Sequence, residues 1–290
     1  MSGVIAPSER QLEALRSGDP AERLALVHLA AVRDAAAWPR FLAAQGGAAK
    51  ASGGRRRYAG RVDTVLCGGA MRFDWLLVDE FPSRELAVES LRLENAHAKE
   101  ALAEAVVLAV KPRGIPGALL AIGGLAARVL GRGASEPKRA LSEAPAEDPA
   151  ISPDVRALET YLTAAPAQPF CMLNLNRHRE RARYAEPIAE EANVSGAVAY
   201  RRYGRNTLPY LLRRAAGPIF AGEPIGLVVG DPAHPLAAGW DELLLVRYPR
   251  RAAMLDMLTA AKYQAGLVHR SAGLERAALL ATTPVQAAAD

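Results

Sequence analysis

The sequence predicts an α+β protein made of two units of the same kind, joined head to tail in one chain. The residues from Phe73 to Arg84 recur as Trp240 to Arg251, each with an apolar run that ends at an aromatic–proline pair. In both halves, apolar runs and helical segments follow the order strand, helix, strand, strand, helix, strand. The chain has 290 residues, of which 50% are hydrophobic, so each half can bury a core of its own.

The first unit is expected to span residues 20–112. Its apolar runs predict strands near 22–32, 56–68, 73–81 and 104–111, and the segments between them predict helices near 35–50 and 83–101. The pair Phe81 and Pro82 marks the end of the third strand. Proline cannot donate a hydrogen bond to a sheet, but it is tolerated in the first turn of a helix.

The second unit is expected to span residues 154–290, with the same order of elements and an insertion near 197–216. Strands are predicted near 169–176, 218–230, 240–248 and 277–282, and helices near 180–193, 206–215 and 250–264. The helix near 206–215 belongs to the insertion, because about 16 more residues than in the first unit separate the first helix from the second strand.

A unit with this order of elements forms a four-stranded antiparallel sheet with both helices on one face. The other face of the sheet is apolar and must be covered. We therefore predict that the two sheets pack face to face and form a closed or nearly closed α+β barrel within the chain. The segment 113–153 between the units is expected to hold an apolar helix near 115–130, followed by a linker rich in Ala, Pro and Ser.

The second unit contains three distinctive stretches, Met172–Leu175, Trp240–Leu255, and Lys262–Ala265 with His269 and Arg270 shortly after it. These stretches resemble a family designated domain-of-unknown-function group thirteen-thirty. The resemblance implies a ferredoxin-like βαββαβ fold of the dimeric α+β barrel superfamily, here in tandem. The first unit matches weakly and is expected to be a degenerate copy. The wider superfamily includes cofactor-free monooxygenases, isomerases and haem proteins, so the resemblance favours no single activity.

Composition and charge argue against several classes of partner. Lys and Arg number 36 against 31 Asp and Glu, for a net charge of +5, which does not indicate nucleic-acid binding. The apolar run 115–130 is short for a membrane span, so we expect no membrane contact. Cys67 and Cys171 lack metal-ligand spacing, and two cysteines suit a reducing cytoplasm. A small molecule is the partner we expect, and self-association stays open.

Arginine and tyrosine are concentrated in the predicted insertion of the second unit. Arg202, Tyr203 and Arg205 are candidates for binding an anionic, ring-bearing molecule. Guanidinium groups bind carboxylates in a forked geometry, and tyrosine offers an aromatic face with a hydroxyl at its tip. The alternative is a solvated, salt-bridged helix and turn.

Asn174 is the candidate on the first strand of the second unit. It alternates with Leu173 and Leu175, so its side chain points to the opposite face, where a polar group needs partners. We therefore expect Asn174 to line a pocket. His28 occupies the equivalent place in the first unit, where a histidine is more often part of the core than a ligand.

Two histidines are candidates for moving a proton. His178 follows the first strand of the second unit beside Arg177, and His269 follows its second helix beside Arg270. Histidine titrates near neutral pH and can act as acid or base, while the arginines would bind a substrate. Surface polarity is the alternative for both pairs. Tyr263 either faces the same pocket or packs its helix.

Three functions are consistent with these residues. The first is an enzyme without an organic cofactor, of monooxygenase, isomerase or lyase type, whose substrate enters the barrel of the second unit. It requires a pocket between sheet and helices lined by Asn174, and a fully packed barrel interior would argue against it. The second is a non-catalytic ligand-binding or assembly protein. The third is a haem protein, with His28, His97, His178 or His269 as its axial ligand. The sequence contains no phosphate-loop, dinucleotide-binding or HExxH motif.

Overall fold

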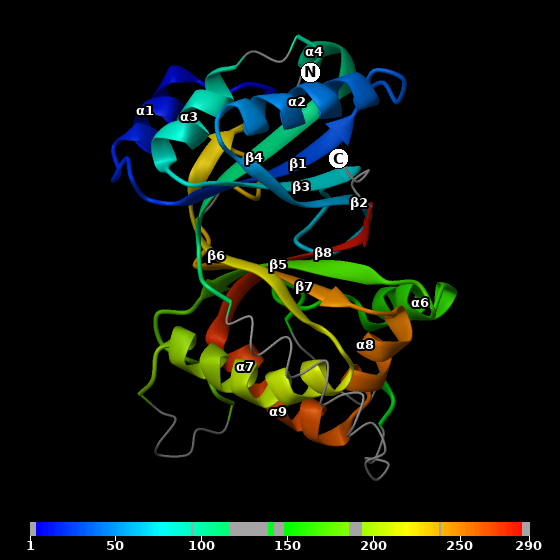
Figure 1. Cartoon of the computed structure of the whole chain (residues 1–290). Helices are drawn as coiled ribbons and strands as arrows, with labels where there is room; N and C mark the ends of the chain where they lie inside the picture. The colour runs from blue at the N-terminus through cyan, green and yellow to red at the C-terminus, as the bar shows by residue number, and fades with distance from the viewer. Residues whose placement is uncertain are drawn as a thin grey trace.

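The computed structural model of the chain describes residues 4–93, 96–115, 139–141, 148–185, 193–237 and 239–285. Eight strands close into one barrel in the order β1-β3-β2-β8-β5-β7-β6-β4, and every neighbouring pair is antiparallel. The helices lie outside the barrel, one group over each half of it (Figure 1). The predicted α+β barrel within one chain is therefore confirmed.

Each half contributes four strands in the same spatial order. The strands are β1 Leu24–Val32, β2 Arg55–Cys67, β3 Trp75–Phe81, β4 Leu102–Pro112, β5 Phe170–His178, β6 Gly217–Val229, β7 Glu242–Tyr248 and β8 Leu274–Pro284. The first half reads β4-β1-β3-β2 across its sheet and the second reads β8-β5-β7-β6, which is the ferredoxin-like order. The two halves join where β2 pairs with β8 and where β4 pairs with β6.

The register of the strands makes individual positions of the two halves equivalent. His28 on β1 pairs with Leu77 on β3, and Asn174 on β5 pairs in the same way with Leu244 on β7. His28 and Asn174 thus occupy matching places in the two sheets, as predicted. That the halves are copies of one ancestral unit stays a prediction.

Alternating side chains of all eight strands fill the interior of the barrel. On β5, Leu173 and Leu175 point inward and meet Val27 and Leu29 of β1 in one buried cluster. Trp240, from the loop before β7, belongs to the same cluster. Because leucine, valine and aromatic side chains occupy this space, the barrel interior is packed, and a cavity for a ligand must lie outside it.

The helices cover the outer face of each sheet. In the described part of the chain they are α1 Glu9–Arg16, α2 Trp38–Ala51, α3 Arg84–Arg92 and α4 Ala98–Ala101 in the first half, and α6 Val155–Ala164, α7 Gly196–Arg213, α8 Arg251–Leu258 and α9 Ala261–Gly273 in the second. Polar caps start four of them, because Ser8, Ser83, Asp154 and Ser195 each accept a backbone N–H of the first turn.

Several helices differ from those predicted. The predicted helix 83–101 is divided into α3 and α4. Residues 181–185 of the predicted helix 180–193 contain no helix, and residues 186–192 lie outside the described residues. The helix predicted near 206–215 is the second part of α7, which already begins at Gly196. The second helical segment also continues to Gly273 rather than ending near 264.

The segment between the two halves is described only in part. Residues 116–138 and 142–147, which include most of the predicted apolar helix 115–130, lie outside the described residues. Among the residues that the structure describes, no helix is long and apolar enough to cross a membrane. Strands β1 to β4 fall within the predicted range 20–112, and β5 to β8 within 154–290.

Candidate functional site

The second half holds a cavity of about 860 Å³ between the outer face of its sheet and helices α6 to α9. The strands contribute side chains that point away from the barrel interior, among them Met172, Asn174, Leu244, Val246 and Leu279. The helices contribute mainly apolar and aromatic groups, among them Tyr203, Leu211, Met254, Met257 and Tyr263, together with the charged Arg270. A concave, mostly apolar wall with a few polar groups is typical of a small-molecule site.

Asn174 reaches this cavity because side chains alternate along β5. Leu173 and Leu175 enter the barrel, so Asn174 points to the helices, and its predicted orientation opposite to the two leucines is confirmed. Its Nδ2 donates to the carbonyl of Met172 at 3.0 Å and to that of Leu244 at 3.4 Å. These bonds hold the amide against the sheet as a fixed polar group in an apolar floor.

Two glycines set the crossing of the helices that roof the cavity. A Cβ on Gly196 of α7 would lie 2.4 Å from the carbonyl oxygen of Gly273 of α9, and one on Gly273 would lie 2.7 Å from that of Gly196. Farther along, the rings of Tyr210 and Tyr263 are 6.0 Å apart. The helices therefore run antiparallel, with one close crossing at the start of α7 and the end of α9.

Tyrosines from three elements surround the middle of the cavity. The hydroxyls of Tyr203 and Tyr263 form a hydrogen bond of 2.8 Å, and the ring of Tyr200 lies 5.5 Å from that of Tyr203. Burial raises the pKa of Tyr200, Tyr248 and Tyr263 well above the usual value for tyrosine. At neutral pH these hydroxyls are therefore protonated, and they serve as hydrogen-bond donors rather than as bases.

Arg270 places a buried positive charge at one end of the cavity. It is 8% exposed and lines the cavity wall from α9. Its Nη1 donates to Ser152 Oγ at 2.6 Å, and its Nη2 donates to the carbonyl of Ile151. Because both acceptors lie in the segment that leads into α6, Arg270 joins α9 to that segment and its guanidinium is held in one plane.

Glu242 places a carboxylate near the same end of the cavity. Asn176 Nδ2 donates to Tyr200 Oη at 2.9 Å and to Glu242 Oε2 at 3.3 Å. The other carboxylate oxygen, Oε1, lies 3.8 Å from Arg113 Nη1, which comes from the end of the first half. This end of the cavity is therefore polar and carries both signs of charge.

The two histidines predicted to move a proton do not line the cavity. His269 Nδ1 is 2.9 Å from the hydroxyl of Tyr184, on another side of α9. The backbone N–H of His178 donates to Asp241 at 2.7 Å, and burial lowers the pKa of its ring. Among the described residues, no histidine belongs to the cavity wall. The structure thus places neither imidazole in the wall of this cavity.

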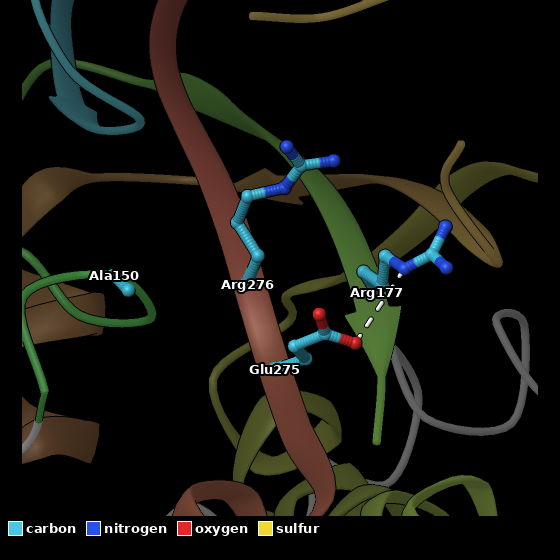
Figure 2. Close-up of a pocket in the computed structure, with 4 residues that line it drawn as sticks. All are labelled: Ala150, Arg177, Glu275 and Arg276. Carbon is cyan, nitrogen blue, oxygen red and sulfur yellow. Dashed lines mark ion pairs between the residues drawn. The ribbon is translucent and has the colours of Figure 1, made fainter. Parts of the chain in front are cut away.

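The predicted arginines are also dispersed. Arg177 lies in a separate, open depression, where its Nε is 3.5 Å from Glu275 and where Arg276 and Ala150 are neighbours (Figure 2). Arg205 is exposed on α7, and the half-buried Arg202 does not line the cavity. Of the nine predicted site residues, the cavity brings together four: Asn174, Tyr203, Tyr263 and Arg270.

Several wall residues were not predicted as site residues, chiefly Tyr200, Glu242, Tyr248, Met254 and Met257. A helical period would have found Tyr200. Positions 200, 203, 207 and 211 share one face of α7, and this face is visible only if the helix begins near residue 196 rather than 206. The apolar residues could not be recognised, because an apolar side chain in a wall and one in a core have the same sequence signature.

The cavity does not fit a haem held by histidine. His28 lies in the first half, His97 precedes α4, and neither His178 nor His269 is on the wall. Within the described ranges, no group of three or more His, Cys, Asp or Glu side chains could hold a metal ion. The wall offers hydrogen-bond donors, the buried guanidinium of Arg270, the exposed guanidinium groups of Arg156 and Arg201, and apolar area, which suit an organic molecule.

No known protein family matches the chain. No curated protein matches it in sequence either. The resemblance to domain-of-unknown-function group thirteen-thirty therefore stays a prediction.

Several solved structures are weakly similar. A protein of unknown function from Rhodopseudomonas palustris is 27% identical over 47% of this chain and 98% of its own, with a TM-score of 0.42. A candidate monooxygenase from Lactobacillus acidophilus is 9% identical over 91% and 94%, with a TM-score of 0.44. Chlorite dismutase from Candidatus Nitrospira defluvii, in complex with imidazole, is 11% identical over 96% of each chain, with a TM-score of 0.46. None of these similarities indicates an activity. The strand order and the cavity themselves define an intrachain α+β barrel protein with a ligand-sized cavity in its second half.

Proposed function

We propose that the second half of the protein binds a small, ring-bearing organic molecule between its sheet and its helices. The observation that carries this proposal is the cavity of about 860 Å³, since small-molecule sites generally span about 300 to 1,000 Å³. Its wall combines apolar and aromatic side chains with polar groups that include Asn174, the Tyr203–Tyr263 pair, Glu242 and Arg270. The apolar area would supply affinity, and the polar groups would orient the ligand.

A catalytic role is the second candidate, and the hydrogen-bonded pair of Tyr203 and Tyr263 favours it. A hydroxyl supported by a second hydroxyl can donate to an oxygen that gains negative charge during a reaction. Because burial raises the pKa of Tyr263, this hydroxyl would stay protonated and act as a hydrogen-bond donor. An isomerase or lyase that passes through an enolate would fit such a donor.

A variant that fills the cavity tests the proposed site. Leu244 lines the floor, so Leu244→Trp places a ring where the ligand would lie. Ile225 on β6 is 40% exposed and does not line the cavity, so Ile225→Trp is the matched control. Binding of a panel of naphthalene and biphenyl derivatives would be measured by calorimetry, and any retained ligand would be identified by native mass spectrometry. We expect the parent protein and Ile225→Trp to bind, and Leu244→Trp to lose binding.

Equal binding by Leu244→Trp and the parent protein would refute the proposed location. No binding by the parent protein to any compound of the panel, together with no retained molecule in the mass spectrum, would refute the function itself. The melting temperature of each variant is measured alongside, so that loss of the fold is distinguished from loss of the site.

A further inference from the structure

The charged groups Glu242 and Arg270 lie at the same end of the cavity, and from this we infer the class of ligand. Resting on the proposed function, we propose that the ligand is an amphipathic carboxylate. Its carboxylate lies beside Arg270, and its apolar part extends toward Met254 and Met257.

The floor of the cavity changes from polar to apolar along paired strands. The register of β5 and β7 gives four pairs in succession, namely Asn176–Glu242, Asn174–Leu244, Met172–Val246 and Phe170–Tyr248. The first pair is polar, the second is mixed, and the last two are apolar or aromatic. A ligand that lies along these strands therefore meets polar groups at one end and apolar groups at the other.

The roof of the cavity changes in the same direction. Tyr200 accepts a hydrogen bond from Asn176, so the start of α7 lies over the polar end of the floor. Because α9 runs antiparallel to α7, its end brings Arg270 to this same end of the cavity. Three turns along α7, Leu211 joins Met257 in a buried apolar cluster. The change from polar to apolar side chains thus occurs in the same direction along the floor and the roof of the cavity.

Three arginines line the cavity, and Arg270 is buried whereas Arg156 and Arg201 are exposed, so Arg270 is the one best placed to bind an anion inside it. Ser152 and Ile151 fix the guanidinium, so a ligand does not have to order a flexible side chain when it binds. The side chain is 8% exposed, and at low dielectric a charge-assisted hydrogen bond is stronger than in water. A carboxylate matches the planar fork of a guanidinium, which favours a carboxylate over a spherical anion.

Two carboxylates of the wall would oppose an anion, the exposed Asp154 and the half-buried Glu242. The Glu242 carboxylate accepts from Asn176 and lies 3.8 Å from the Arg113 guanidinium, so its charge is partly balanced inside the protein. If Glu242 determined the ligand instead of Arg270, a cationic ligand would bind best. Three ligands of the same ring and different charge separate these two cases.

The test compares 2-naphthoate, 2-naphthamide and 2-naphthylmethylammonium with the full-length protein at pH 7 by calorimetry. We expect 2-naphthoate to bind roughly 10- to 100-fold more tightly than the amide, because a hydrogen bond to a charged group contributes more than a neutral one. The ammonium compound should bind most weakly. If the amide binds as tightly as the carboxylate, or the ammonium compound binds best, the inference is wrong while the proposed function stands.

A pair of variants locates the anion. Arg270→Gln should reduce the affinity for 2-naphthoate to that for the amide and leave the affinity for the amide within about threefold. Arg205→Gln removes an exposed arginine of α7 outside the cavity and should change neither affinity. A variant Arg270→Gln that still prefers the carboxylate would overturn the role of Arg270.

Arg270 also holds residues 151 and 152, so its replacement could prevent folding. In that case the comparison of the three ligands in the parent protein decides the charge of the ligand without any variant. If none of the three compounds binds, and none of the wider panel does, the proposed function fails together with the inference.

Discussion

The two halves of the barrel share strand order and register, but they differ in what lies between sheet and helices. In the first half this space is filled by a network of polar side chains and a cluster of aromatic rings. In the second half it is a cavity of about 860 Å³. The difference shows that one backbone arrangement can support either a closed or an open layer, according to a few side chains that face the helices.

The network of the first half is centred on Asp79, whose side chain is fully buried. Gln45 of α2 donates to Asp79 Oδ2 at 2.7 Å, and Arg56 Nη2 donates to the same oxygen at 3.2 Å. Gln45 Nε2 also lies 3.3 Å from His28 Nε2. Trp38 of α2 stacks on Trp75 at 5.1 Å and fills the space beside the network.

Register identifies what replaces this network in the second half. Arg56 pairs with Asp79 across β2 and β3, and the equivalent pair across β6 and β7 is Pro218 with Val246. Both Pro218 and Val246 line the cavity. A short apolar pair therefore stands where the first half has a long ion pair, and the volume that the ion pair fills is left open.

One polar contact is retained in both halves. Arg84 and Arg251 are the first residues of the helices that follow the third strand of each half, and both are 7% exposed. Arg84 donates to the carbonyl of Leu15 in α1, and Arg251 donates to that of Tyr161 in α6. In each half this arginine thus links the short helix that precedes the first strand to the helix that follows the third strand. The contact is present both in the first half, where the space between sheet and helices is filled, and in the second half, where it is a cavity.

The largest expected effect comes from breaking the network that closes the first half. Asp79→Val introduces into the first half the residue type that the second half has at the equivalent position, Val246, but it leaves Arg56 beside an apolar group. We expect the free energy of unfolding to fall by about 3 to 4 kcal/mol, because one partner of a buried ion pair is lost. Urea denaturation measures it. The double variant Arg56→Leu with Asp79→Val should recover at least about 1 kcal/mol. A cost below about 1 kcal/mol for the single variant would contradict the role of the network.

The next effect depends on pH and on the residue equivalent to Asn174. Burial lowers the pKa of His28 to about 4, with Asp79 opposing this shift and Arg56 adding to it. The folded state therefore holds a neutral His28, and its stabilising contribution is complete above about pH 6.5 and is lost as the pH falls toward 4. We expect the parent protein to lose about 2 kcal/mol from this group between pH 7 and pH 4.5.

His28→Asn, which copies the second half, should remove that part of the acid sensitivity. The measurement is the free energy of unfolding of both proteins at several pH values. Asn174→Gln is the control in the second half, and it should shift stability by the same amount at every pH. A parallel pH dependence for His28→Asn and the parent protein would show that His28 does not titrate as described.

The strands of both halves could be predicted from the sequence, and the difference between the halves could not. Alternating apolar residues, with an aromatic–proline pair at the end of β3 and of β7, located the strands to within a few residues. The start of α7 was missed because Gly204, Pro209 and several arginines obscure its helical period. Asn174 was recognised from its alternation with leucines. His178 and His269 were chosen for their chemistry, but side-chain direction, which the sequence does not contain, turns them away from the cavity.

The helix crossing above the cavity gives a smaller effect that is specific to the second half. Gly273→Ala places a Cβ 2.7 Å from the carbonyl oxygen of Gly196 and 2.9 Å from the backbone nitrogen of Tyr200, so α7 and α9 must separate. We expect a loss of about 2 kcal/mol and weaker ligand binding. Gly47→Ala on α2, where a Cβ meets nothing within 4 Å, should instead stabilise by about 0.5 to 1 kcal/mol. Thermal unfolding compares them, and equal effects would show that the crossing is not tight.

The smallest effect distinguishes an open layer from a packed interior. Val246→Leu adds a methylene group on the cavity floor, where space is present, so stability should change by less than about 1 kcal/mol. Val78→Leu makes the same change inside the barrel, where Val78 is fully buried among side chains of the central cluster, and it should cost about 1 to 3 kcal/mol. Val246 and Val78 lie on β7 and β3, the equivalent strands of the two halves, so backbone propensity is matched. Urea denaturation of both variants measures the contrast. If both substitutions lower the free energy of unfolding by the same amount, the side chains of α7 and α8 already occupy the space above Val246. The cavity is then not available to a ligand.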